Sequence, residues 1–203
     1  MIRKHDSNGS VRSIALMLML LAVAMTSATS VTTVGAQNAA KAPAVATTIE
    51  NFGKVDDQYY RGSQPSERQM AELKRLGVKT IIDLRKDKVA RASDWAQNAG
   101  LHYFNIRMLP GRAATDEQTK YFFSLVNDPA NWPVYVHCKG GRHRTGALTA
   151  VYRITHDGWT AAQAYEEMKA YDFNDGFFGG PSAQKKFVFS FYERHVAPNA
   201  SSR

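Results

Sequence analysis

Residues 133–158 read PVYVHCKGGRHRTGALTAVYRITHDG and change periodicity halfway. The run 133–137 is apolar, β-branched and aromatic, which predicts a buried strand. From Thr145 onward, apolar residues recur at helical spacing until Gly158, a helix stop signal. The stretch therefore predicts a strand, a tight loop and a helix.

The loop contains Cys138, the only cysteine of the chain. A lone cysteine is most often a small buried hydrophobe, and that interpretation is the alternative to a chemical role. At a strand-to-helix junction, however, free N–H groups and the helix dipole favour an anion. Gly140 and Gly141 allow successive amides to point inward as an anion-binding nest. Such a nest lowers the pKa of a thiol, so Cys138 is predicted to be a nucleophile.

The same nest fits the oxygens of a phosphate group. Arg144 follows Cys138 by six residues, and its planar guanidinium can hold two of those oxygens, which a lysine cannot reproduce. The predicted chemistry is attack of the cysteine on phosphorus.

The pattern Cys-x5-Arg, preceded by His137 and followed by Thr-Gly, resembles the signature loop of the cysteine-dependent protein tyrosine and dual-specificity phosphatase superfamily. Two further stretches extend the resemblance, YYRGSQP at 59–65 and TIIDLR at 80–85. In this order, the three motifs are similar to those of small atypical dual-specificity phosphatases of bacteria, plants and fungi. Of the residues in the two weaker motifs, we expect Arg61 and Gln64 to orient loops, and Asp83 and Arg85 to form a fold-stabilising pair.

The resemblance implies a two-step mechanism without metal or cofactor, in which Cys138 forms a cysteinyl-phosphate that water hydrolyses. Arg144 would stabilise the phosphoryl oxygens. Thr145 would donate a hydrogen bond to the sulfur, or else only cap the following helix. His137 would orient the loop from behind, the alternative being a freely titrating base. The expected substrate-binding residues are Lys139, Gly140, Gly141, Arg142, His143 and Thr145.

The resemblance also implies an aspartate on a separate loop that protonates the leaving group. In the stretch 108–118, MLPGRAATDEQ, Leu109 and Pro110 stand where that aspartate is expected. Asp116 is the nearest carboxylate and is our predicted general acid, although an acidic residue there also suits a helix N-terminus. Asp172 and Asp175 are the fallback candidates.

Extra positive charge in the loop bears on the substrate. Lys139, Arg142 and His143 are similar to basic loop residues of phosphoinositide phosphatases of the phosphatase-and-tensin type and of enzymes acting on inositol polyphosphates. We expect a phosphorylated protein as the substrate, through tyrosine or dual-specificity activity, and keep inositol polyphosphates or phosphoinositides as the alternative. A sulfurtransferase and a non-catalytic phosphate-binding module are more distant alternatives.

The first 36 residues predict a signal peptide. They contain a basic start, an apolar core at 14–25 and the sequence Val-Gly-Ala, with cleavage expected after Ala36. We therefore expect an exported protein, periplasmic or extracellular, the alternative being a membrane anchor through residues 14–25. Cleavage would change the formal charge from +8 to +6, because three basic residues and one acidic residue are removed. A basic chain suits an anionic substrate or membrane surface. The sequence contains no spacing typical of a zinc site or a helix-turn-helix motif, so we do not expect it to bind nucleic acid.

After a flexible lead-in at 37–47, one phosphatase domain is expected at 48–197, with a tail at 198–203. Short strands are predicted within 48–62 and at 79–85, 102–108 and 133–137. Helices are predicted at 66–76, 88–98, 115–127, 145–157, 160–171 and 182–195. Alternating strands and helices predict an α/β fold with a central, mostly parallel sheet flanked by helices. The loop of Cys138 would lie at the carboxyl end of a strand, where such sheets bind ligands.

Overall fold

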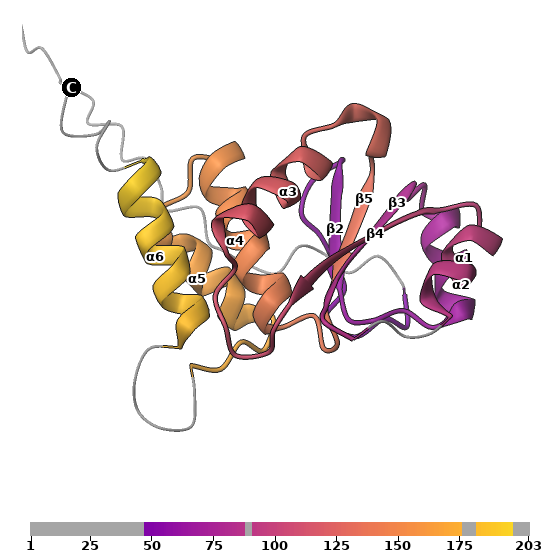
Figure 1. Ribbon diagram of the computed structural model, residues 1–203, viewed down its shortest axis with the longest axis horizontal. Helices are drawn as coiled ribbons and strands as arrows, with labels where there is room; N and C mark the ends of the chain where they lie inside the picture. Colours follow the sequence, from indigo (N-terminus) through magenta and orange to yellow (C-terminus); the bar gives the residue numbers. More distant parts are fainter. Residues whose placement is uncertain (1–46, 88–90, 176–181, 197–203) are drawn as a thin grey trace, which may run out of the picture. The chain divides into compact units, whose positions relative to one another are not determined.

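A computed structural model describes residues 47–87, 91–175 and 182–196 (Figure 1). The chain divides into two units, 1–37 and 38–203, and all of the described residues belong to the second unit. The expected signal peptide, the tail at 198–203 and nearly all of the lead-in lie outside the described residues. Among the helices that are described, none has the length and apolar character needed to cross a membrane.

The core element is a five-stranded sheet with the strand order β1-β2-β5-β3-β4. β1 pairs antiparallel with β2, and the other neighbours are parallel. The expected α/β fold with a mostly parallel sheet is confirmed. The strands are β1 (Gly53–Lys54), β2 (Tyr59–Gly62), β3 (Thr80–Arg85), β4 (His102–Met108) and β5 (Val134–His137).

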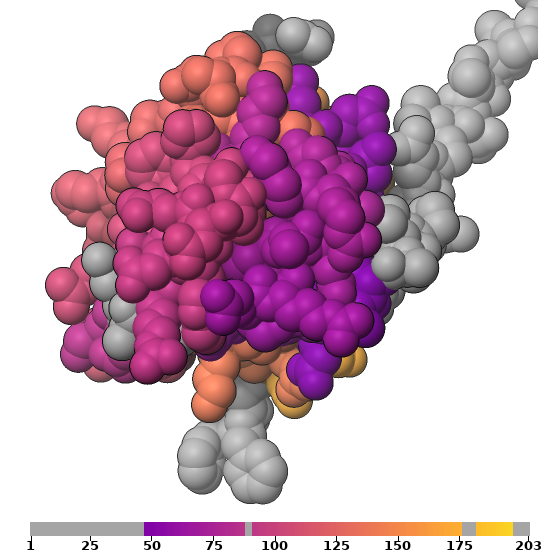
Figure 2. Space-filling model, turned by 90° about the vertical axis from the view of Figure 1, so that its right-hand side faces the viewer, coloured from indigo at the N-terminus to yellow at the C-terminus, as the bar shows by residue number. Residues whose placement is uncertain are grey.

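Helices cover both faces of the sheet, with α1 and α2 on one side and α3 to α6 on the other (Figure 1). The side of α1 and α2 faces the viewer in Figure 2, where purple and magenta atoms make up most of the surface. The helices are α1 (Glu67–Arg75), α2 (Ala92–Asn98), α3 (Asp116–Val126), α4 (His143–His156), α5 (Ala161–Ala170) and α6 (Ala183–His195), and a short 3-10 helix η1 (Pro129–Asn131) precedes β5.

The side chains of each strand alternate between two apolar clusters, because successive side chains point to opposite faces of the sheet. In β3, Ile81 packs in the cluster of α1 and α2, whereas Ile82 packs in the larger cluster on the other face. In β5, Tyr135 and Val136 divide in the same way. Burial on both faces explains why these strands read as nearly continuous apolar runs.

A complete capping box fixes where three of the helices begin. Ser66, Thr115 and Thr160 each accept a hydrogen bond from the backbone three residues later, and a glutamine side chain there bonds back to the cap. The helix expected from Thr145 begins two residues earlier, at His143. Its N-cap residue, Arg142, makes no side-chain cap bond, so no capping residue marks this start in the sequence. Of the helix expected at 88–98, the described part begins at Ala92, and residues 88–90 lie outside the described ranges.

A buried polar network lies where β3 ends. Arg85 donates to the fully buried carboxylate of Asp83 through Nε (2.9 Å to Oδ1) and Nη2. Tyr103 Oη donates to the same carboxylate at 2.7 Å, and Arg85 Nη1 donates to Gln64 Oε1 at 2.6 Å. Burial raises the pKa of Asp83, but the bonds from Arg85 and Tyr103 and the proximity of His137 outweigh it, so the pKa is lowered. Asp83 and Arg85 thus form the pair that the sequence predicts.

We expect Asp83→Asn to lower the free energy of unfolding by about 3 kcal/mol, because it leaves the charge of Arg85 without its buried partner. Urea unfolding followed by circular dichroism measures this. Because the folded-state pKa of Asp83 is lowered, its stabilising effect is present above the unfolded pKa and disappears as the pH falls through the folded value. The cost of the substitution should therefore shrink in acid.

The matched control is Asp57→Asn, which removes the exposed pair with Lys54. It should leave the unfolding midpoint almost unchanged. Equal destabilisation by the two substitutions would contradict a stabilising role for the buried pair.

Candidate active site

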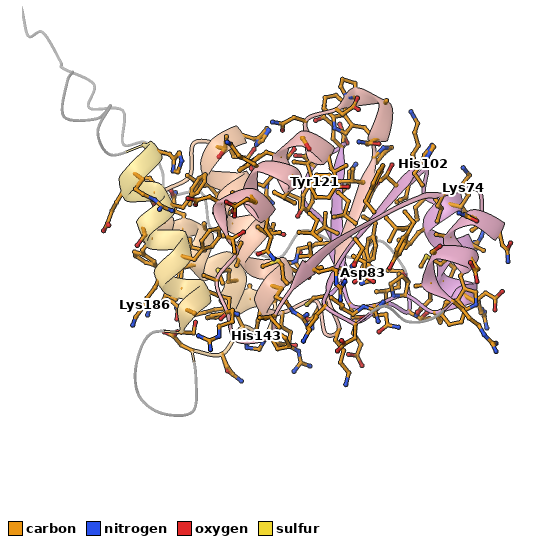
Figure 3. All side chains as sticks on the ribbon, viewed as in Figure 1. Lys74, Asp83, His102, Tyr121, His143 and Lys186 are labelled. Atoms are coloured by element: carbon orange, nitrogen blue, oxygen red, sulfur yellow. The ribbon has the colours of Figure 1, made fainter. Side chains whose placement is uncertain are left out.

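The loop of Cys138 connects the end of β5 to the start of α4, at the carboxyl edge of the parallel strands. Figure 3 places His143 at the start of α4 and Asp83 at the sheet, both toward the lower side of the view. A cavity of about 410 Å³ opens at this loop. Its lining brings together Cys138, Lys139, Gly140, Arg142, His143 and Arg144 with Glu50, Pro110 and Gly111.

Three consecutive loop carbonyls are bound by groups from the start of the domain. The bonds are Gln64 N–H to Lys139 O (3.1 Å), Asn51 Nδ2 to Gly140 O (2.9 Å) and Arg61 Nη2 to Gly141 O (2.7 Å). By contrast, the N–H groups of residues 139–142 donate to no oxygen atom within the described residues, and that of Gly141 interacts with the Cys138 sulfur. These donors are therefore left for an anion, as expected of a nest at a helix start.

Gly141 is required by the path of the loop. Its φ is 68°, a conformation that favours glycine, and a Cβ atom would lie 2.5 Å from the carbonyl carbon of Gly62. The close contact with β2 is what allows Arg61 and Gln64 to reach the loop, so both residues orient it as expected.

Cys138 is 3% exposed, and its pKa is lowered. Burial raises the pKa of the thiol, but the side chain and backbone of Thr145, the charge of Arg144 and the Gly141 N–H outweigh it. The Thr145 hydroxyl is buried and makes no hydrogen bond to any atom of the described residues, so it is free to turn toward the sulfur. The combination favours the thiolate, the nucleophilic form.

Arg144 is held at the ends of two strands. Its Nη1 donates to Met108 O at 3.1 Å and to Leu84 O at 3.4 Å. These bonds fix the guanidinium while the side chain lines the same cavity as Cys138. A fixed guanidinium is ready to bind a phosphoryl group without reorganisation.

His137 is fully buried behind the loop. Its Nδ1 lies 3.1 Å from Cys138 O and 3.9 Å from Asp83 Oδ1, and its ring stacks on Tyr135 at 5.8 Å. Burial lowers the pKa of His137, and the nearby carboxylate of Asp83 offsets this only in part. A neutral, enclosed imidazole favours the orienting role over a freely titrating base.

The segment 171–175 lies beside the loop. Arg142 Nε is 3.8 Å from Asp172 Oδ2, and the His143 ring is 5.1 Å from the ring of Phe173. Burial lowers the pKa of His143, and the charges of Arg142 and Arg144 act in the same direction. Of the fallback acids, the exposed Asp172 is therefore a neighbour of the cavity rim.

Asp175 is bound elsewhere. It accepts hydrogen bonds from Lys185 Nζ (2.8 Å), the Ser182 N–H (2.9 Å) and Tyr165 Oη (3.0 Å). Burial raises its pKa, but these bonds outweigh it and lower the pKa to about 2. A carboxyl group that stays ionised at neutral pH is unsuited to donate a proton.

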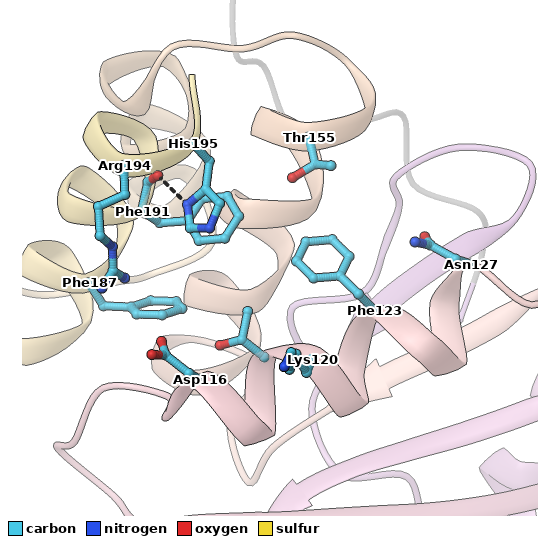
Figure 4. A pocket seen from close by; sticks show the side chains of 10 residues that line it. Asp116, Lys120, Phe123, Asn127, Thr155, Phe187, Phe191, Arg194 and His195 are labelled. Carbon is cyan, nitrogen blue, oxygen red and sulfur yellow. Dashed lines mark hydrogen bonds between the residues drawn. The ribbon is translucent and has the colours of Figure 1, made fainter. Parts of the chain in front are cut away.

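Asp116 is not brought to Cys138. It is the exposed first residue of α3 and lines a different pocket, shown in Figure 4. Its assignment as general acid stays a prediction without a supporting contact.

Glu50 is the carboxylate that lines the cavity of Cys138. No motif marked Glu50 or Asn51, because both reach the loop only through tertiary structure.

In the described part of the chain, no group of three His, Cys, Asp or Glu side chains is placed to hold a metal ion. The side chains that line the cavity of Cys138 supply a thiol, the guanidinium of Arg144 and the carboxylate of Glu50.

The chain resembles known phosphatases in sequence and in structure. It is 32% identical over 140 residues to the dual specificity protein phosphatase TpbA of Pseudomonas aeruginosa, covering 68% of this chain and 63% of TpbA. The inositol diphosphatase SIW14 of Saccharomyces cerevisiae is 25% identical over 130 residues, covering 61% of this chain and 46% of SIW14. The matched regions thus span less than two thirds of these relatives. A crystal structure of P. aeruginosa TpbA in complex with pTyr superposes with a TM-score of 0.61 at 28% identity, covering 73% of this chain and 88% of that one.

Residues 37–188 also match the sequence profile described as "DSP-PTPase phosphatase fused to NAD+ Kinase". This match includes every strand and the whole loop of Cys138. The chain therefore belongs to the DSP-PTPase phosphatase family.

Proposed function

We propose that the chain is a cysteine-dependent phosphomonoesterase. The observation that carries the proposal is the loop of residues 138–144, in which a thiol with a lowered pKa, a fixed arginine and free N–H donors line one cavity. The Cys138 thiolate attacks phosphorus, and the bond from phosphorus to the ester oxygen breaks. The leaving oxygen takes up a proton and departs as an alcohol. Water then attacks the cysteinyl-phosphate, the sulfur–phosphorus bond breaks, and inorganic phosphate leaves.

We propose phosphorylated protein, with phosphotyrosine foremost, as the substrate. In support, TpbA is named a dual specificity protein phosphatase and its structure holds pTyr. The carboxylates are consistent with this. Asp116 lines a different pocket and Asp175 is bound to Lys185, which leaves Glu50 in the lining and Asp172 beside Arg142 as the carboxylates near the cavity among the described residues. A phenol leaves more readily than an alkyl alcohol without a strong general acid, so an aryl ester suits this site best.

Inositol polyphosphates or phosphoinositides are the second candidate. Lys139 and Arg142 are exposed at the mouth of the cavity, where a substrate with several phosphate groups would place its further charges. The relative SIW14 is named an inositol diphosphatase. Within this class, the same reasoning about the general acid favours a substrate with a diphosphate group, because phosphate is a better leaving group than an inositol hydroxyl.

We propose export through the first 36 residues. The basic start and apolar core support it, and the family match begins at residue 37, directly after the expected cleavage site. Anchorage through residues 14–25 stays the alternative, and the basic charge of the chain suits contact with an anionic membrane surface.

The first test is phosphate release from an aryl phosphate by the purified chain with chelator present. We expect activity that survives the chelator and falls by more than about a thousandfold in Cys138→Ser, because the serine hydroxyl is not ionised at this site. Arg144→Lys should also lose most activity, since an ammonium group cannot bind two oxygens in one plane. Full activity in Cys138→Ser would refute thiol chemistry.

A second test follows the alkylation rate of Cys138 against pH by mass spectrometry. Because the pKa of Cys138 is lowered, we expect the rate to level off below the ordinary thiol pKa. Thr145→Val removes a hydrogen bond to the thiolate and should move the inflection to higher pH. Thr149→Val is the matched control, since the Thr149 hydroxyl on the same helix pairs with Tyr59, not with the sulfur. An inflection that stays in place in Thr145→Val would contradict the role given to Thr145.

A third test separates the two substrate classes with the double variant Lys139→Ala and Arg142→Ala. If the substrate has several phosphate groups, kcat/KM for an inositol polyphosphate should fall by about a hundredfold, at roughly tenfold for each charged contact. The value for a phosphotyrosine peptide should fall much less. Equal losses on both substrates would show that the two cations do not distinguish them.

A further inference from the structure

A second cavity of about 650 Å³ lies between α3 and α6, and none of its lining residues belongs to the loop of Cys138 (Figure 4). We name it the α3–α6 groove. The residues that matter for its chemistry are Phe123, Phe187, Phe191, Lys120, Arg194 and Asp116. Its volume is in the range of pockets that hold small molecules, about 300 to 1,000 Å³.

Aromatic rings form the apolar side of the groove. Phe123 of α3 and Phe191 of α6 both line it and stack on each other, with ring centroids 6.1 Å apart. Phe187 lies one helical turn before Phe191, and the ring of His195 stacks on Phe191 at 4.2 Å. The Phe191 carbonyl and His195 Nδ1 lie 2.9 Å apart, which holds that ring in place (Figure 4). A flat aromatic or alkyl body would bury its surface against these rings.

The charged side chains that line the groove do not pair with one another. Lys120 and Arg194 make no ion pair within 4.0 Å with any carboxylate in the described ranges, although Glu117, which lies outside the lining, interacts electrostatically with Lys120. Asp116 is the one carboxylate in the lining, and its side chain also has no ion-pair partner in those ranges. Two unpaired cations against one carboxylate give the groove an excess of positive charge, which favours an anionic group.

We propose that the α3–α6 groove is a second ligand site that binds an amphipathic anion, with a flat aromatic or alkyl body and a carboxylate-like head. The body packs against Phe123, Phe187 and Phe191, and the head is held by Lys120 and Arg194. A cationic amphiphile is disfavoured by the same two side chains. The site is separate from the phosphatase chemistry proposed for Cys138, so either proposal can fail without the other.

The test uses 8-anilinonaphthalene-1-sulfonate, an aromatic sulfonate whose fluorescence rises on burial, titrated into the purified full chain. We expect saturable binding that dodecanoate displaces and dodecylamine does not. Lys120→Ala with Arg194→Ala should weaken the affinity by about tenfold or more. Lys186→Ala is the matched control, because Lys186 is an exposed lysine of α6 outside the groove, and it should leave the affinity unchanged.

Two further arms locate the probe. Thr155→Phe fills the groove from α4 and should abolish binding while the circular dichroism spectrum is retained. Cys138→Ser should bind the probe as the parent chain does, and inorganic phosphate should not displace it. Displacement by phosphate, or unchanged affinity in the double charge variant, would overturn the proposal. The charge variant decides the matter even if Thr155→Phe fails to fold.

Discussion

Three hydrogen bonds to the carbonyls of residues 139–141 decide the shape of the active-site loop. Each bond contributes about 1 kcal/mol on its own, which is modest. Together they turn three successive carbonyls toward the start of the domain and leave the N–H groups for a ligand. An anion site is thus already formed before a ligand arrives, so that little reorganisation is needed at the moment of reaction.

The donors of these bonds are themselves held at a cost. Arg61 is fully buried, and two of its nitrogen atoms have no hydrogen-bond partner within the described residues. Burial lowers the pKa of Arg61, while the proximity of Glu167 acts in the opposite direction. The guanidinium also lies 3.8 Å from the ring centre of Tyr171. Asn51 adopts a φ of 53°, which most residues avoid. The buried, partly unbonded Arg61 and the positive φ of Asn51 are both locally unfavourable, and both residues hold the loop carbonyls in place.

The sequence predicts the parts of this arrangement that depend on local chemistry. The apolar run before Cys138 and the capping box at Thr115 are visible as patterns, and both elements form as expected. The spacing of Cys138 and Arg144 likewise predicts one shared anion site. These features depend on neighbours within one strand or one turn, where a single sequence is informative.

The contacts of the loop with distant segments are not predictable in this way. Asn51 reaches Gly140 from far away in the sequence, and Glu50 enters the cavity beside it. Asp116 is a residue that the sequence places near the site but the fold does not. Its position after a strand and before a helix suggests the loop that carries the general acid. In the fold, however, its helix directs it into the groove between α3 and α6. Proximity in the sequence predicts a helix cap, but it does not predict which side of the helix faces the thiol.

The charges around the cavity connect the fold to the reaction. Lys139, Arg142 and Arg144 line it, whereas Glu50 is the one carboxylate among its described lining residues. A site of this composition stabilises the negative charge that builds up on the phosphoryl group more than it supplies a proton to the departing oxygen. Selectivity should then follow the stability of the leaving group as an anion. In the reaction proposed for this loop, phenolates and phosphates meet that condition better than simple alkoxides, so the positions of a few carboxylates would decide which ester is preferred.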